Sequence, residues 1–119
     1  MIEICRHESG FSVSGHAGYA ESGKDIICAA ISALLQAFVV SVDELTDDNI
    51  QSEIRAGNAV IKYKDLSEQG TLLMESFFCG VNLIAANYPE YVRAVDDDKS
   101  NREKERQREA DKITEFERR

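Results

Sequence analysis

Hydrophobic and polar residues alternate with a period of two in four short stretches of this chain. The stretches lie at residues 1–7, 11–15, 50–56 and 59–65. This period predicts β-strands that bury one face. Turn-forming residues separate the members of each pair, at residues 8–10 in the first and at Gly57-Asn58 in the second. We therefore expect two β-hairpins.

Two longer stretches repeat their apolar residues at the spacing of an α-helix. Residues 26–43 follow Asp25, a good N-cap, and are apolar on nearly every side. Such a helix is usually buried, so we expect it between a sheet and either the second helix or a partner subunit. Residues 67–88 carry one apolar stripe, and Pro89 is expected to end or kink this helix because proline lacks a backbone N–H. Residues 89–92 are expected to start one more turn.

The order of these elements, ββαββα, predicts an α+β fold. A mainly antiparallel sheet is expected to pack against two long helices as a two-layer sandwich. The pattern ends after Val95, where three aspartates open an almost wholly charged stretch. We expect one domain over residues 1–95 and a charged C-terminal tail over residues 96–119, either helical or disordered.

Charge and composition exclude several classes of function. The net charge of the 119 residues is −8, and most of the acidic excess lies before the tail. An acidic surface repels phosphate backbones and attracts basic peptides, so no direct nucleic-acid partner is expected. We found no uninterrupted apolar stretch of membrane-spanning length and no secretory signal, which predicts a cytoplasmic protein without a membrane partner. Three widely spaced cysteines without a CxxC or CxxH pair predict neither disulfides nor a metal site, and no cofactor is expected.

One segment collects the chemistry of a nucleophilic site. His16 ends the second predicted strand, Cys28 opens the first helix, and a loop with Gly18 and Gly23 joins them. A cysteine attacks as the thiolate, and a free thiol with a pKa of about 8.5 is ionised only to a small extent at neutral pH. A helix N-terminus and a nearby imidazole both favour the anion, whereas the carboxylate of Asp25 opposes it. The N–H groups of the first helical turn are also candidates for an oxyanion hole.

The same residues have structural interpretations. A lone cysteine at a helix start is commonly a small buried hydrophobe, and a lone histidine at a strand end is usually structural. Glycines before a helix can also cradle a phosphate. The chain has no GxGxxG or GxxxxGK[ST] motif, however, and Lys24 is the only lysine in the loop.

The complete segment resembles the signature of a known family. Residues 15–20, Gly-His-Ala-Gly-Tyr-Ala, and residues 23–34, Gly-Lys-Asp-Ile-Ile-Cys-Ala-Ala-Ile-Ser-Ala-Leu, look like the motif of the ribosomal-processing cysteine protease Prp family. The resemblance extends over about residues 1–95 and implies an α+β homodimer. It implies that Cys28 is the nucleophile, that His16 is the general base, and that a loop over residues 17–24 gates the site. The other site positions that it implies, for substrate binding or gating, are Gly15, Gly18, Tyr19, Gly23, Asp25 and Ser32.

The resemblance also implies a reaction. Members of the family remove a short N-terminal extension from large-subunit ribosomal protein number twenty-seven in bacteria, through a thioester intermediate. The expected partner is therefore the precursor of that ribosomal protein. The tail over residues 96–119 departs from the family pattern and leaves two alternatives open. One is a prophage-associated protease that trims capsid or scaffold proteins, and the other is a non-enzymatic, ribosome-associated binding module.

Overall fold

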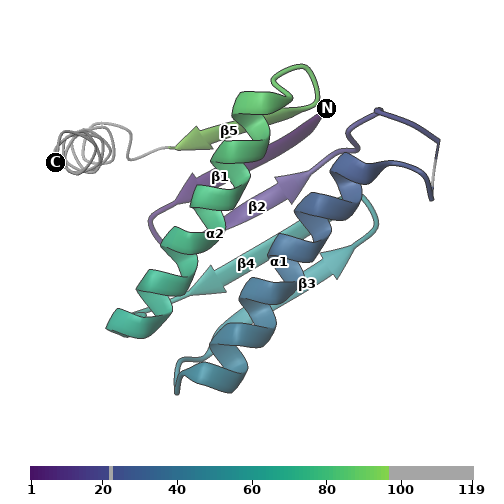
Figure 1. Ribbon diagram of the computed structural model, residues 1–119. Helices are drawn as coiled ribbons and strands as arrows, with labels where there is room; N and C mark the ends of the chain where they lie inside the picture. Colours follow the sequence, from purple (N-terminus) through teal and green to yellow (C-terminus); the bar gives the residue numbers. More distant parts are fainter. Residues whose placement is uncertain (22, 97–119) are drawn as a thin grey trace, which may run out of the picture.

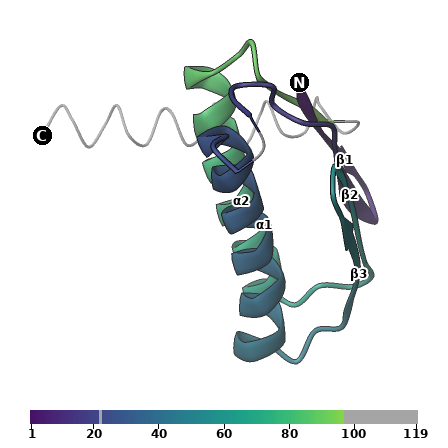
Figure 2. The ribbon, with the colours of Figure 1, turned by 90° about the vertical axis from the view of Figure 1, so that its right-hand side faces the viewer.

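The computed structural model describes residues 1–21 and 23–96, and these residues form two layers (Figures 1 and 2). The elements, in chain order, are β1 (Ile2–His7), β2 (Gly10–Ser14), α1 (Ile26–Leu45), β3 (Ile50–Arg55), β4 (Asn58–Tyr63), α2 (Glu68–Asn87) and β5 (Val92–Asp96). Both helices lie side by side on one face of the sheet (Figure 2). The expected α+β sandwich of a mainly antiparallel sheet and two long helices is confirmed. The expectations for the tail after Asp96 fall outside the described residues.

The five-stranded sheet has the order β3-β4-β2-β1-β5. Both predicted hairpins are present, and β2 joins them by pairing antiparallel with β4, so that Ser14 lies opposite Asn58. This pairing brings the end of β2 next to the turn between β3 and β4 (Figure 1). The sheet thereby places the chain that follows β2, which includes His16, beside a turn that is remote in sequence.

The strand β5 was not predicted. One more helical turn is expected after Pro89, but α2 ends at Asn87, as the proline requires, and the chain turns into β5. Two N–H groups, those of Tyr91 and Val92, donate to the carbonyl of Tyr88 and close this turn. β5 then pairs parallel with β1. Five residues of mixed polarity carry little strand signal by themselves, and the hydrogen bonds that stabilise β5 come from the far end of the chain.

The core lies between the sheet and one face of each helix. The buried apolar side chains of α1 are Ile27, Ile31, Leu35, Phe38 and Val42. Phe11 of β2 meets Phe77 of α2 in a stacked arrangement, with ring centroids 4.9 Å apart. Burial of one such side chain contributes about 1.5–3 kcal/mol. Within the single chain, α1 packs on the sheet and beside α2, and its opposite face is open, since Ile26 and Val40 are more than half exposed.

The length of α1 corrects a second expectation. No uninterrupted apolar stretch of membrane-spanning length is expected from the sequence, but α1 has 20 residues and is apolar enough to cross a membrane by length and composition alone. Core helices of soluble proteins pass the same test. In this structure the helix uses five of its side chains to cover the sheet.

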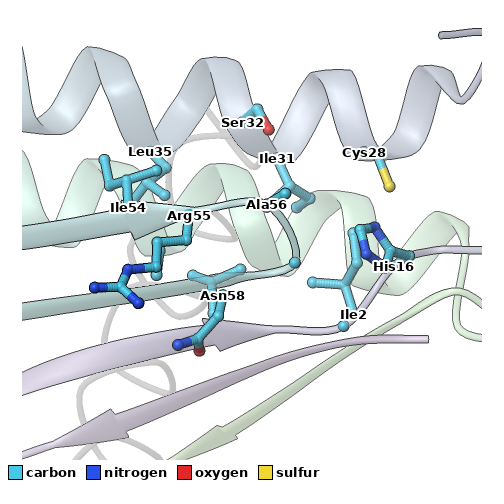
Figure 3. A pocket seen from close by; sticks show the side chains of 14 residues that line it. Ile2, His16, Cys28, Ile31, Ser32, Leu35, Ile54, Arg55, Ala56 and Asn58 are labelled. Atoms are coloured by element: carbon cyan, nitrogen blue, oxygen red, sulfur yellow. The ribbon is translucent and has the colours of Figure 1, made fainter. Parts of the chain in front are cut away.

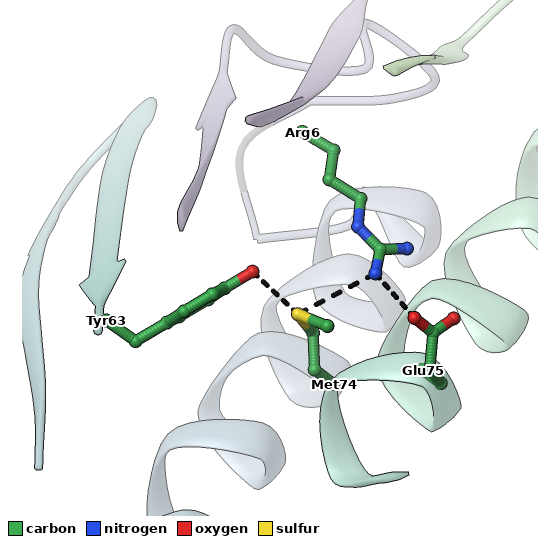
Figure 4. Close-up of polar contacts among 4 residues, drawn as sticks. All are labelled: Arg6, Tyr63, Met74 and Glu75. Atoms are coloured by element: carbon green, nitrogen blue, oxygen red, sulfur yellow. Dashed lines mark hydrogen bonds and ion pairs between the residues drawn. The ribbon is translucent and has the colours of Figure 1, made fainter. Parts of the chain in front are cut away.

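A polar cluster lies within this core (Figure 4). Arg6 of β1 is almost fully buried, and its Nη2 donates to Glu75 Oε1 of α2 at 2.6 Å. Its guanidinium carbon lies 4.3 Å from the ring centre of Phe78. The hydroxyl of Tyr63 donates to the sulfur of Met74 at 2.6 Å, and burial raises the pKa of this tyrosine, with Glu75 and Asp96 adding to the rise and Arg6 opposing it. The cluster connects α2 to the sheet.

Candidate active site

Cys28 is the third residue of α1, and Asp25 begins the helix as its N-cap. The Oδ1 atom of Asp25 accepts hydrogen bonds from the N–H groups of Ile27 at 3.1 Å and Cys28 at 3.0 Å. The predicted N-cap is therefore confirmed. The cap fixes the thiol in the first helical turn, where the helix dipole favours a negative charge.

His16 follows β2, and three backbone contacts hold the segment to which it belongs. The N–H of Gly15 donates to the carbonyl of Gly57 at 2.9 Å, and the backbone nitrogen of Met1 donates to the carbonyl of His16 at 2.6 Å. On the other side, the N–H of Ala17 donates to the sulfur of Cys28 at 3.3 Å. The segment is thus fixed between the sheet and the start of α1. In Figure 3 the imidazole of His16 and the thiol of Cys28 point toward one another.

The hydrogen bond from Ala17 has a chemical consequence for Cys28. Ala17 is buried, so its N–H has little access to water and is directed at the sulfur. A donor of this kind interacts more strongly with a thiolate than with a neutral thiol. The capping carboxylate of Asp25 lies at the same helix end and accepts the N–H groups of Ile27 and Cys28.

The expectation that the first helical turn supplies an oxyanion hole is corrected. The N–H groups of Ile27 and Cys28 already donate to the carboxylate of Asp25, and the N–H of Ala29 donates to the backbone carbonyl of the same residue. In this conformation these three donors stabilise the helix end, because the capping carboxylate accepts two of them and the backbone carbonyl of Asp25 accepts the third.

The carboxylate of Asp25 also connects the helix to the glycine-containing loop. Its Oδ2 atom accepts a hydrogen bond from the N–H of Tyr19 at 3.1 Å. The hydrogen bond from Cys28 N–H is the largest cause that lowers the pKa of Asp25, with further lowering from Tyr19, the thiol of Cys28 and Ile27, against a smaller opposing effect of desolvation. At neutral pH, Asp25 is therefore a carboxylate that connects the loop to the helix through hydrogen bonds.

Two cavities meet at the thiol and the imidazole. The smaller, of about 250 Å³, lies between α1 and the β3–β4 hairpin, and its floor is largely apolar (Figure 3). The larger, of about 580 Å³, lies beneath the glycine-containing loop. His16, Cys28 and Ser32 line both cavities. An extended chain that crossed from one cavity to the other would pass along these three side chains.

The other predicted site residues are distributed around these cavities. Gly18, Gly23 and Asp25 line the larger cavity, and Gly15 lines the smaller one. Tyr19 lines neither cavity. Its ring packs instead edge-to-face on Tyr91 beside β5, with centroids 5.3 Å apart.

The β3–β4 hairpin contributes cavity residues that the sequence analysis did not assign to the site. These are Ile54, Arg55, Ala56, Gly57, Asn58 and Ala59. The Gly57-Asn58 turn is a recognisable local signal, but no local pattern indicates which other segment the turn contacts. Among residues 1–21 and 23–96, no group of three or more His, Cys, Asp and Glu side chains is arranged to hold a metal ion.

Comparison with known proteins gives one family and several solved structures. The sequence model of one protein family, described as cysteine protease Prp, matches residues 1–93 of this chain. A crystal structure of the essential ribosomal processing protease Prp from Staphylococcus aureus, with a covalently linked product peptide, has a TM-score of 0.74 at 23% identity and covers 81% of this chain and 97% of that chain. The same protease with a substrate peptide has a TM-score of 0.69 at 22% identity, again over 81% and 97% of the two chains.

A third solved structure is more similar in sequence. SMU.848 from Streptococcus mutans is 30% identical, with a TM-score of 0.62, and the match covers 80% of this chain and 90% of that chain. No curated protein sequence matches the chain.

Proposed function

Because this chain belongs to the cysteine protease Prp family and is therefore a cysteine protease, we propose that Cys28 is its nucleophile and His16 its general base. The observation that carries the proposal is that thiol and imidazole face one another where the two cavities meet. Enzymatic activity replaces the alternative of a non-enzymatic binding module. Cys5 is a poorer candidate, since it lies within β1 and lines neither cavity.

The proposed reaction proceeds in two halves. His16 takes the proton of the Cys28 thiol, and the thiolate attacks the carbonyl carbon of the scissile peptide bond. The carbon–nitrogen bond breaks as His16 returns the proton to the leaving amine, and a thioester to Cys28 remains. Water then attacks the thioester with His16 as the base, which releases the carboxylate product and restores the thiol. The N–H of Ala17 supports the anionic form of the sulfur in both halves.

For the substrate, we propose the N-terminal extension of large-subunit ribosomal protein number twenty-seven. The structurally similar Staphylococcus aureus enzyme is described as a ribosomal processing protease and was crystallised with substrate and product peptides, which supports this proposal. The largely apolar floor of the smaller cavity suits a large apolar side chain near the cut. The acidic charge of the chain suits basic residues elsewhere in the peptide.

The domain boundary, the assembly and the location belong to the same proposal. We keep a protease domain over residues 1–95, which is close to the end of the family match at residue 93, and a separate tail over residues 96–119.

We propose a homodimer, because apolar side chains of both helices, such as Val40 and Leu83, are exposed on the outside of the helix layer. A bacterial cytoplasmic location agrees with a ribosomal substrate.

Peptide cleavage tests the proposed substrate. The protein is incubated with a synthetic peptide that carries the extension and the first residues of the mature ribosomal protein. The masses of the products are measured by mass spectrometry. We expect one cut with the wild-type protein and none with Cys28→Ala or His16→Ala, while circular dichroism shows that both variants remain folded. A peptide from a phage scaffold protein, tested in parallel, represents the viral alternative. An uncut ribosomal peptide, or equal cutting by Cys28→Ala, would contradict the proposal.

A further inference from the structure

Gly57, in the turn between β3 and β4, lies against the tip of the His16 imidazole. The backbone of Gly57 is in the left-handed region, with φ of +74°. A Cβ atom built on this residue would lie 2.7 Å from His16 Nε2, 3.2 Å from Cε1 and 3.5 Å from Cδ2. The ring therefore occupies the space that any side chain at residue 57 would need.

The backbone of Gly57 also holds the chain that carries His16. Its carbonyl accepts the hydrogen bond from the N–H of Gly15 at 2.9 Å, one residue beyond the last β2–β4 pair, Ser14 with Asn58. One residue therefore fixes the backbone immediately before the histidine and also borders its ring. This coincidence follows from the antiparallel pairing of β2 with β4, which aligns the turn with the end of β2.

We propose that Gly57 is a positioning residue for the general base, and this inference rests on the proposed function of His16. Because Gly57 has no side chain, the imidazole lies flush against the turn and is directed toward Cys28. A methyl group at this position would displace the ring, which is the free end of a rotatable side chain. The fold would tolerate that movement, whereas proton transfer from Cys28 would not, because misplacement of a catalytic group by about 1 Å is associated with losses of about 100-fold.

Two substitutions separate the effect of the methyl group from backbone strain. Gly57→Ala adds a Cβ atom and is also strained at positive φ, whereas Gly57→Asn adds the Cβ atom but tolerates the left-handed region better. We expect both variants to lose about 100-fold in kcat/KM, mainly through kcat, although Gly57→Asn melts closer to the wild type. Gly80→Ala is the matched control, because the atoms nearest to its new Cβ atom would be those of the Leu34 side chain, at 3.0 Å, and neither residue lines the two cavities. We expect this control to retain wild-type activity.

The rate at which iodoacetamide alkylates Cys28, resolved from that of the other cysteines by peptide mass spectrometry, gives a readout that does not depend on the peptide substrate. The pH profile of this rate in Gly57→Ala should approach that of His16→Ala. The double variant His16→Ala/Gly57→Ala should react at the same rate as His16→Ala, because Gly57 acts only through the ring.

The outcomes separate this inference from the proposed function. If His16→Ala slows alkylation and Gly57→Ala does not, the role of Gly57 is refuted and that of His16 stands. Recovery of wild-type activity in Gly57→Asn, or a further loss in the double variant, would likewise refute the positioning role. If His16→Ala itself leaves alkylation of Cys28 unchanged, both the catalytic pair and the role of Gly57 are refuted.

Discussion

Asp25 combines two roles at the level of single residues. Its Oδ1 atom caps α1 immediately before the nucleophile, and its Oδ2 atom holds the N–H of Tyr19 in the glycine-containing loop. By accepting hydrogen bonds from both segments, Asp25 fixes the loop and the helix end relative to one another.

The pKa of Asp25 leads to a prediction about pH. Hydrogen bonds to the folded carboxylate lower its pKa below the usual 3.8, so the contribution of the cap is fully present above that value. This contribution is lost only as the pH falls through the lower folded value. We expect the amide resonances of Tyr19 and Cys28 to stay constant at pH 5–7 and to shift together below pH 3.8 in NMR spectra. Asp25→Asn should abolish this titration, and a midpoint above 3.8 would contradict the prediction.

The two reactive side chains could be identified as candidates from the sequence because their signals are local. Asp25 and Cys28 are within one helical turn, and the glycines that flank His16 belong to the same short segment. The direction of the His16 ring was not predictable, since it is set by Gly57, whose place beside the ring depends on strand pairing. The hydrogen bond from Ala17 to the sulfur could not be predicted either, because it depends on how closely the loop approaches α1.

At the scale of elements, Arg6 and Glu75 connect β1 to α2. The side chain of Arg6 is 5% exposed and that of Glu75 is 42% exposed, so the pair lies at the edge of the core (Figure 4). The Nε of Arg6 has no hydrogen-bond partner among the described residues. A buried guanidinium with one unsatisfied donor depends strongly on the partners that it does have.

Substitution of Glu75 tests this connection. Glu75→Ala removes a charge-assisted hydrogen bond from a buried cation, and we expect the free energy of unfolding to fall by about 1–2 kcal/mol, a value reduced for the partial exposure of the carboxylate. Chemical denaturation measures the change. Glu53→Ala is the control, because its ion pair with Arg55 is largely exposed and should contribute less than about 0.5 kcal/mol. Equal destabilisation by the two substitutions would contradict the proposed importance of the buried pair.

The elements themselves were predicted to different degrees. The hairpins and both helices followed from periodicity, and Asp25 and Pro89 marked two helix ends by their local chemistry. The strand β5 did not, because its pairing partner β1 lies at the opposite end of the chain. The same cause explains why the β3–β4 hairpin was predicted as structure but not as part of the site.

At the scale of the whole molecule, the helix layer presents apolar residues to its outside. Exposed side chains on α1 and α2 include Ile26, Val40, Leu72 and Leu83. A single apolar side chain on a surface is ordinary, and the proposed homodimer would bury several of them at once. These side chains lie on the side of the helices that faces away from the sheet. A partner bound there would contact the helices and not the sheet.

The proposed homodimer is tested by light scattering at micromolar concentration. We expect a mass of twice the 13.3 kDa of the chain. Val40→Glu or Leu83→Glu would place a charge in the apolar interface and should shift the mass toward that of a monomer. Gln51→Glu, on the exposed edge strand β3, is the control and should leave the mass unchanged. A monomeric wild-type protein would contradict the homodimer.

The sequence by itself determined the features that depend on neighbouring residues. These are the helix ends, the two hairpins, and the presence of a thiol and an imidazole around a glycine-containing loop. The tertiary structure decided the rest: which face of α1 is buried, the parallel β1–β5 pair, the cavities on either side of Cys28, and the contact between Gly57 and His16. The physical reason is that strand pairing joins segments far apart in the chain, and local residue patterns do not record which partner each strand selects.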